Sequence, residues 1–144
     1  MTDELFILPD TEFMEQQGIT VLVADDSDLV RRNIVKLLEG CPVIRQIIHS
    51  HSVYSTIQKM EVEQPDAVIL DLQLPDGSGF DLLEYIRLKP QHVLVIVLTN
   101  FPDPGNRERA LKLGADFFLD KSFEYEQLPD LLVQGTTYQS GGRA

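Results

Sequence analysis

The sequence predicts a single α/β domain built on a doubly wound parallel sheet. Its 144 residues, of which 43% are hydrophobic, are enough for one domain with a substantial core. Short, nearly continuous apolar runs alternate with segments of helical periodicity, and this alternation is typical of parallel strands buried on both faces. Several of the runs end on an acidic, hydroxyl or basic residue, at the edge where such sheets place their ligands.

Five apolar runs predict five strands, at residues 19–24, 43–49, 67–70, 93–98 and 116–119. The second run is the least apolar, so we expect that strand near an edge of the sheet. Five helices are predicted between and after the strands, at about 27–38, 52–63, 80–88, 105–113 and 124–134.

The ends of the predicted helices carry local signals. Ser27 is suited to cap the first helix, and Gly40 follows its end. Gln64-Pro65 ends the second helix, and Gly114 ends the fourth. The stretch 74–79, Leu-Pro-Asp-Gly-Ser-Gly, favours bends and predicts a turn after the third strand.

The domain is expected to span residues 19–134, between two polar ends. Residues 1–18 contain five acidic residues and no lysine or arginine, so we expect a flexible acidic N-terminal extension. Residues 135–144 are small and polar, which predicts a disordered tail.

The charge, the single cysteine and the lack of long apolar stretches limit the possible partners and the compartment of the protein. A net charge of -11 and a pI of about 4.5 argue against direct binding to nucleic acid or to an anionic membrane. Cys41 alone cannot form an internal disulfide and fits a reducing compartment. No apolar stretch reaches the roughly 18 residues of a membrane span, and the N-terminus lacks the basic region of a signal peptide. These features predict a cytoplasmic protein.

Polar side chains follow four of the predicted strands. The pair Asp25-Asp26 follows the first strand, Asp71 the third, Thr99 the fourth and Lys121 the fifth. The carboxyl ends of parallel strands meet at one edge of a sheet, so we expect these side chains to lie together. The grouping suits a divalent metal ion and a phosphoryl group.

Three carboxylates at one edge require a positive charge among them. Like charges about 4 Å apart repel by roughly 4 kcal/mol at an effective dielectric constant near 20. Mg²⁺ is a hard cation that binds one or two carboxylates together with phosphate oxygens and water. With no Ser-His or Cys-His pair evident, a carboxylate is the best nucleophile, and Asp71 suits this role because the adjacent pair suits metal binding.

Four segments of the chain resemble the receiver domains of two-component response regulators, over about residues 19–133. They are Val-Leu-Val-Ala-Asp-Asp at 21–26, Asp-Leu-Gln-Leu-Pro-Asp-Gly-Ser-Gly at 71–79, Val-Leu-Thr at 97–99 and Gly-Ala-Asp-Phe-Phe-Leu-Asp-Lys at 114–121. The resemblance implies a flavodoxin-like fold, in which helices flank a five-stranded parallel sheet of strand order 2-1-3-4-5.

The same resemblance implies a phosphoacceptor and a Mg²⁺ site. Asp71 would accept a phosphoryl group from a histidine kinase or a histidine phosphotransfer protein. Asp26 would bind Mg²⁺ directly and Asp25 mainly through water, and the backbone carbonyl of Gln73 would complete the site with Asp71.

The resemblance also implies how phosphorylation would be sensed. Thr99 and Lys121 would contact the phosphoryl group. Phe118 matches the aromatic switch position, which is expected to turn inward when Thr99 moves toward the phosphate. Judged only by its place in a strand, Phe118 would be a core residue.

Residues near the predicted site depart from the usual receiver pattern. Ser122 follows the lysine where receivers usually have a proline, often after a cis peptide bond. Asn100 and then Phe101 follow Thr99, where the family usually has a small residue, and their bulk should hinder water and small phosphodonors. Gln73 could shield the acyl phosphate or orient a water molecule. We therefore expect altered, slowed self-dephosphorylation.

The predicted function is a phosphorylation-dependent signalling switch rather than an enzyme. We expect a stand-alone receiver that signals by protein–protein contact, on the last two helices and the fifth strand, or by onward phosphoryl transfer. One alternative is a pseudo-receiver that binds partners without phosphorylation. Another is a Mg²⁺-dependent aspartyl-phosphate phosphohydrolase of the haloacid dehalogenase type, but the segment 71–73 lacks the second acid of that class and the chain has no room for a cap domain. The cognate kinase, the downstream protein and homodimerisation are left open.

Overall fold

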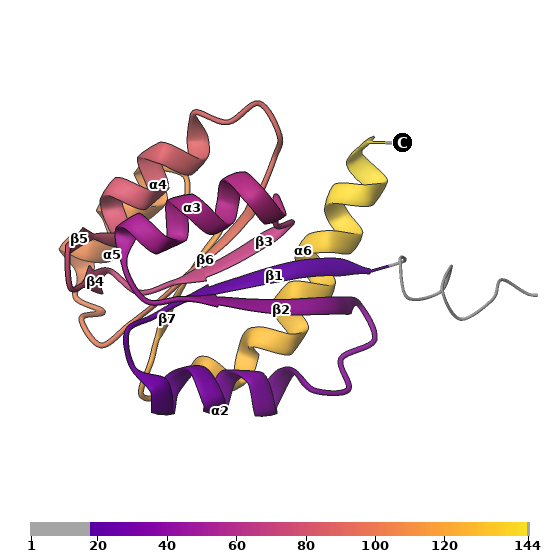
Figure 1. Cartoon of the computed structure of the whole chain (residues 1–144), viewed down its shortest axis with the longest axis horizontal. Helices are drawn as coiled ribbons and strands as arrows, with labels where there is room; N and C mark the ends of the chain where they lie inside the picture. Colours follow the sequence, from indigo (N-terminus) through magenta and orange to yellow (C-terminus); the bar gives the residue numbers. More distant parts are fainter. Residues whose placement is uncertain (1–17, 144) are drawn as a thin grey trace, which may run out of the picture.

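A computed structural model describes residues 18–143, and its centre is a parallel sheet (Figure 1). The five strands are β1 (Ile19–Ala24), β2 (Ile44–Ser50), β3 (Ala67–Leu70), β6 (Leu94–Thr99) and β7 (Phe117–Asp120). They lie in the order β2-β1-β3-β6-β7, and all neighbouring pairs are parallel. The predicted fold class and strand order are confirmed, with the least apolar strand at an edge.

Helices cover both faces of this sheet (Figure 1). One face is covered by α2 (Asp28–Leu38) and α6 (Leu128–Arg143), and the other by α3 (Val53–Glu63), α4 (Gly79–Arg87) and α5 (Pro104–Lys112). A 3₁₀ turn, η2 (Tyr125–Gln127), leads into α6. Successive strand residues point to opposite faces, so each layer of helices has its own apolar core. This two-sided burial explains the nearly continuous apolar runs in the sequence.

Four helices begin at a side chain that accepts a hydrogen bond from the first turn. The N-caps are Ser27 for α2, Ser52 for α3, Ser78 for α4 and Asp103 for α5. These oxygen atoms satisfy backbone N–H groups that have no partner within the helix. The predicted cap at Ser27 is confirmed.

The turn after β3 is tied to the start of α3. It contains two short antiparallel strands, β4 (Gln73–Leu74) and β5 (Gly77–Ser78), where the sequence indicated only a turn. Asp76 accepts hydrogen bonds from the backbone N–H of Val53 at 2.6 Å and of Tyr54 at 2.9 Å, one on each carboxylate oxygen. The negative charge also suits the partial positive charge at the helix N-terminus.

Asp76→Asn should lower the melting temperature at neutral pH, because an amide offers one acceptor oxygen and no charge. The hydrogen bonds from the backbone of Tyr54 and Val53 hold the pKa of Asp76 below its usual range. The carboxylate therefore stabilises the fold above the pKa of the unfolded chain, and this contribution is lost as the pH falls through the lower folded pKa. Melting curves at neutral and strongly acidic pH should show the variant and the wild type converging on acidification.

The control for Asp76 is Glu84→Gln, which neutralises an exposed carboxylate on α4. Its melting temperature should match that of the wild type across the pH range. A difference between Asp76→Asn and the wild type that stays constant with pH would show that the charge of Asp76 plays no part.

α5 is held to the sheet by few buried contacts. Of its nine residues only Ala110 is buried. The guanidinium group of Arg109 lies 4.0 Å from the centre of the Phe80 ring, and that of Arg107 lies 5.8 Å from the Phe118 ring. Arg107 also donates a hydrogen bond to the carbonyl oxygen of Phe118 at 3.2 Å. Cation–π contacts at exposed sites contribute about 0.5–1 kcal/mol each, so these arginines are a substantial part of the attachment.

The C-terminal helix corrects one expectation from the sequence. α6 continues to Arg143, where we had predicted a helix ending near residue 134 and a disordered tail over residues 135–144. A Cβ atom on Gly135 would lie 2.7 Å from a methyl carbon of Leu94 in β6, so glycine allows the helix to approach the sheet closely. The Thr136 hydroxyl then donates to the carbonyl oxygen of Leu132 at 2.7 Å. Gly135 and Thr136, which the sequence placed at the start of a tail, here belong to the helix.

Residues 1–17 and 144 are not described by the structure. The predicted acidic extension over residues 1–18 therefore lies outside the described residues, apart from Gly18. Within residues 18–143, no helix combines the length and the apolar character needed to cross a membrane.

Candidate functional site

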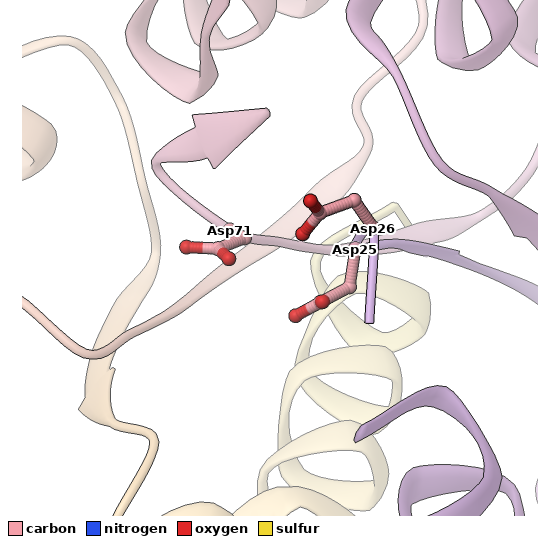
Figure 2. Close-up of side chains that lie close together, drawn as sticks. All are labelled: Asp25, Asp26 and Asp71. Carbon is pink, nitrogen blue, oxygen red and sulfur yellow. The ribbon is translucent and has the colours of Figure 1, made fainter. Parts of the chain in front are cut away.

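Three aspartates meet at the carboxyl edge of the sheet. Asp25 directly follows β1 and Asp71 directly follows β3, two strands that lie side by side. One carboxylate oxygen from each of Asp25, Asp26 and Asp71 lies within 4.8 Å of the other two (Figure 2). Asp25 and Asp71 are buried, whereas Asp26 is exposed. These are hard oxygen donors of the kind that hold Mg²⁺.

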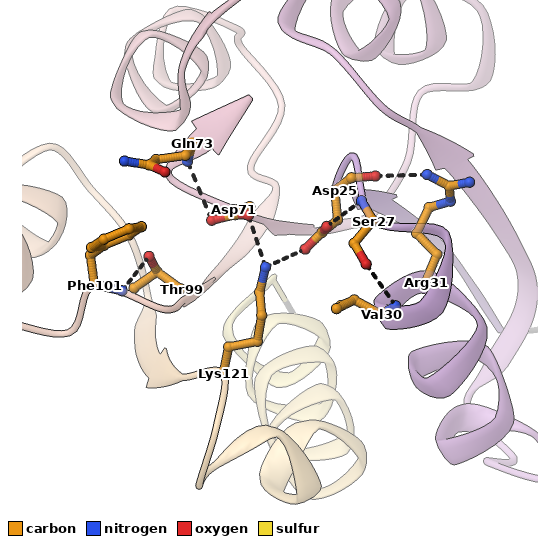
Figure 3. Close-up of polar contacts among 9 residues, drawn as sticks. All are labelled: Asp25, Ser27, Val30, Arg31, Asp71, Gln73, Thr99, Phe101 and Lys121. Atoms are coloured by element: carbon orange, nitrogen blue, oxygen red, sulfur yellow. Dashed lines mark hydrogen bonds and ion pairs between the residues drawn. The ribbon is translucent and has the colours of Figure 1, made fainter. Parts of the chain in front are cut away.

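Lys121 lies between two of these carboxylates (Figure 3). Its Nζ is 2.7 Å from Asp25 Oδ2 and 2.8 Å from Asp71 Oδ2. Each of the three side chains is at most 9% exposed, so water screens these ion pairs poorly. One ammonium among three carboxylates leaves the cluster negative, and the cluster can therefore attract a further cation.

Burial raises the pKa of Asp71, although the hydrogen bond and charge of Lys121 act to lower it. Burial acts to lower the pKa of Lys121, but hydrogen bonds to Asp25 and Asp71 outweigh it, and the pKa of Lys121 is raised. Lys121 is therefore protonated at neutral pH. The ionised form of Asp71 is disfavoured by its surroundings, and a cation bound beside it would favour that form.

The loop after Asp71 folds back against it. The Gly79 N–H donates to the carbonyl oxygen of Leu72 at 2.8 Å. A Cβ atom on Gly79 would lie 2.3 Å from the carbonyl oxygen of Asp71, so only glycine fits here. The Gln73 N–H donates to Asp71 Oδ1 at 3.3 Å, opposite the oxygen that faces Lys121. Metal binding by the Gln73 carbonyl remains a prediction.

Thr99 ends β6 and is fully buried. Its Oγ1 accepts a hydrogen bond from the backbone N–H of Phe101 at 3.1 Å, as Figure 3 shows. Its carbonyl oxygen accepts one from the backbone N–H of Lys121 at 2.8 Å. The hydroxyl acts as an acceptor in the first of these bonds, so its proton is available to a second partner. Its predicted contact with a phosphoryl group stays a prediction.

Phe118 lies in β7 with 5% of its surface exposed, and Arg107 of α5 covers its ring. This burial is compatible with a core residue and with the inward position of an aromatic switch, so the switch role of Phe118 remains a prediction. In the described part of the chain every peptide bond is trans, including Lys121–Ser122.

A pocket of about 480 Å³ lies beside the loop that follows Asp71, residues 72–78, which we call the acceptor loop. Its lining includes Gln73, Ser78, Phe80, Phe101, Asn106 and Arg109. Phe101 is 46% exposed, and its carbonyl oxygen accepts a hydrogen bond from Asn106 Nδ2 at 3.0 Å. Gln73 and Phe101 thus line the same pocket, while Asn100 is exposed and does not line it.

The sequence analysis did not identify two residues that hold the acidic loop, the segment with Asp25 and Asp26 between β1 and α2. Ser27 was assigned only as a helix cap, yet its N–H also donates to Asp25 Oδ1 at 2.8 Å. Arg31 Nη1 donates to the carbonyl oxygen of Asp25 at 2.8 Å, and its Nη2 pairs with Asp28. Side chains on a helix lean toward its N-terminus, so a basic residue in the second turn after an acid pair is a signal that could have indicated Arg31.

A family model described as the response regulator receiver domain matches residues 21–133. The matched range covers most of the chain and contains the three clustered aspartates, Thr99 and Lys121. The chain belongs to the response regulator receiver family. Receiver domains act in two-component systems, accept phosphoryl groups from kinases and bind Mg²⁺ at an acidic pocket, so phosphorylation-dependent signalling follows from membership.

Similar receivers occur in larger proteins. The chain is 37% identical over 117 residues to protein-glutamate methylesterase/protein-glutamine glutaminase 2 of Koribacter versatilis (strain Ellin345), covering 80% of this chain and 32% of that protein. It is 30% identical over 115 residues to the acid tolerance regulatory protein ActR of Rhizobium meliloti (strain 1021), covering 80% of this chain and 58% of that protein. The chain thus spans about a third of the first relative and just over half of the second.

Solved receiver structures share the fold. A signal receiver domain from Vibrio parahaemolyticus matches this receiver with a TM-score of 0.78 at 25% identity, covering 88% of this chain and 98% of that one.

Proposed function

We propose that this receiver accepts a phosphoryl group on Asp71, with Mg²⁺ held by Asp25, Asp26 and Asp71, and passes the signal on by protein contact or onward phosphoryl transfer. The observation that carries the proposal is Lys121 Nζ lying 2.7 and 2.8 Å from two carboxylates of the three-aspartate cluster. This arrangement combines a buried nucleophile, a cation for an incoming anion and a set of metal ligands.

The transfer step forms one bond and breaks one. A carboxylate oxygen of Asp71 bonds to phosphorus while the P–N bond of a donor phosphohistidine breaks, and the electron pair of that bond stays on the imidazole nitrogen. Lys121 would then pair with a phosphoryl oxygen, and the free hydroxyl proton of Thr99 would be donated to another. Bound Mg²⁺ would neutralise charge on the phosphoryl oxygens.

The three carboxylates fit Mg²⁺ by their chemistry. All the donor atoms are oxygen, they come from a cluster with a surplus of negative charge, and exposed Asp26 leaves one side of the site open to water and phosphate. Burial raises the pKa of Asp71, and a cation bound beside it would offset this effect and favour the ionised nucleophile.

The proposed output surface is the face formed by α5, β7 and α6. Thr99 lies on β6 and Phe118 on the adjacent strand β7. In the register of these two strands, Val97 is the partner of Phe118. Arg107 connects the Phe118 ring to α5. A change in the hydroxyl bonding of Thr99 would reach α5 through the pairing of β6 with β7 and the contact of Arg107 with Phe118.

The proposal is tested by measuring the mass of the intact protein after incubation with a small acyl-phosphate donor or a phosphorylated histidine kinase. We expect a labile phosphoryl adduct when Mg²⁺ is present and none when a chelator removes it. If several donors of both kinds give no adduct, the proposal fails and a constitutive interaction module replaces it.

Phe101→Ala should shorten the lifetime of the phosphoryl adduct severalfold. Phe101 lines the pocket that borders the loop after Asp71, and we expect that removing its ring would give water easier access to the acyl phosphate. The measurement is the decay of the adduct, followed by intact mass after the donor is removed. Leu88→Ala, at an exposed apolar residue directly after α4, is the control and should decay like the wild type. Equal lifetimes for all three proteins would show that Phe101 does not shield the phosphoryl group.

A further inference from the structure

Arg31 ties helix α2 back to the acidic loop that precedes it. Its Nη1 donates to the carbonyl oxygen of Asp25 at 2.8 Å (Figure 3), and its Nη2 pairs with Asp28 in the first turn of α2. The Arg31 side chain is 19% exposed, so most of it is shielded from solvent. A guanidinium group presents several N–H donors in one plane and can serve both acceptors at once.

The carbonyl group held by Arg31 belongs to the peptide unit between Asp25 and Asp26. Because a peptide unit is planar, its orientation fixes the direction in which the chain and side chain of Asp26 leave it. The Asp25 carboxylate has its own partners, the Ser27 N–H at 2.8 Å and Lys121 Nζ at 2.7 Å. Asp26 is exposed, so its carboxylate is placed by its backbone rather than by packing.

The charge of Arg31 and its hydrogen bond have opposite effects on a metal ion at this site. A guanidinium cation near the cluster repels Mg²⁺, so on charge alone the loss of Arg31 would strengthen metal binding. The ion pair with Asp28 reduces this repulsion. The hydrogen bond to the Asp25 carbonyl orients a ligand, so on this ground the loss of Arg31 would weaken metal binding.

We propose that Arg31 is a positioning residue for the metal site. It holds the peptide unit between Asp25 and Asp26 so that the Asp26 carboxylate lies within 4.8 Å of the other ligand atoms. This inference rests on the proposed binding of Mg²⁺ by the three aspartates. Groups that orient metal ligands typically change metal affinity by about 10–100-fold when they are removed.

The test is isothermal titration of the full chain with Mg²⁺ alone. Arg31→Met should weaken binding by about tenfold, the lower end of that range, because the ligand itself remains. Arg31→Lys keeps the charge, but an ammonium lacks the planar fork that serves both acceptors, so its affinity should be intermediate. Arg32→Met is the matched control: it removes the same charge from the exposed neighbouring residue and should leave the affinity unchanged or slightly higher.

The outcomes separate the inference from the proposed function. Arg31→Met binding Mg²⁺ as tightly as Arg32→Met, or more tightly, would overturn the positioning role. Failure of the wild type to bind Mg²⁺ would instead refute the metal site itself. Circular dichroism checks that each variant is folded; if Arg31→Met does not fold, Arg31→Lys decides, since affinity equal to the wild type would overturn the inference.

Discussion

Asp71→Asn should abolish the phosphoryl adduct completely. The amide oxygen is a far weaker nucleophile than a carboxylate, and Asp71 is the carboxylate of the cluster that we assign as the nucleophile. Intact mass measured with Mg²⁺ and a small acyl-phosphate donor should therefore show the adduct on the wild type and none on the variant. Asp76→Asn is the control within the same loop and should still be phosphorylated.

The same substitution should raise the melting temperature at neutral pH. Burial raises the pKa of Asp71, so the folded protein binds a proton more readily than the unfolded chain. The ionised carboxylate therefore lowers stability as the pH rises above the unfolded pKa, and asparagine removes this loss. Lys121 also pairs with Asp25 at 2.7 Å, so in the variant it would not lose all its partners. An adduct on Asp71→Asn would contradict the role of Asp71 as phosphoacceptor, and a variant clearly less stable than the wild type would show that the buried carboxylate does not lower stability.

Lys121→Met should destabilise the protein by about 3 kcal/mol when no Mg²⁺ is present. The substitution removes one partner from buried ion pairs and leaves two carboxylates without a counter-charge, which typically costs about 3–5 kcal/mol. We expect the lower end because exposed Asp26 keeps one side of the cluster in water. Mg²⁺ should restore much of the loss, since it supplies the missing positive charge. Thermal melts with Mg²⁺ and with a chelator measure both effects.

Lys112→Met is the matched control for Lys121. It makes the same chemical change at an ion pair with Glu108 whose side chains are 75% and 69% exposed. Such surface pairs contribute about 0–1 kcal/mol, and no dependence on Mg²⁺ is expected. Equal melting temperatures for Lys121→Met with and without Mg²⁺ would argue against a cation site beside Lys121.

The sheet could be predicted from the sequence because its strands are buried on both faces. β1, β3 and β6 are nearly continuous apolar runs, and a polar residue of the carboxyl edge stands at the end of each. Elements that depend on tertiary contact were not predictable. The β4–β5 pair contains only two residues on each strand, and the extension of α6 depends on the packing of Gly135 against Leu94.

The site was predictable to the level of strand ends and no further. The apolar runs place Asp25, Asp71 and Lys121 at strand ends, and the strand order that brings them to one edge was implied by the family resemblance and is seen in the structure. The bonds of Arg31 to the Asp25 carbonyl and of Asp76 to the start of α3 depend on loop backbone that no periodicity encodes. The roles assigned to the Gln73 carbonyl, Thr99 and Phe118 come from family resemblance and not from the apolar pattern.

The sparse attachment of α5 determines where this fold should open first. With one buried residue out of nine, against five of nine in α4, α5 should show the fastest exchange of amide hydrogens among the helices of its layer. A segment whose local opening requires so little free energy can adopt a second arrangement without disturbing the strands. The sheet can then remain a fixed frame while the population of a single surface helix shifts between two positions.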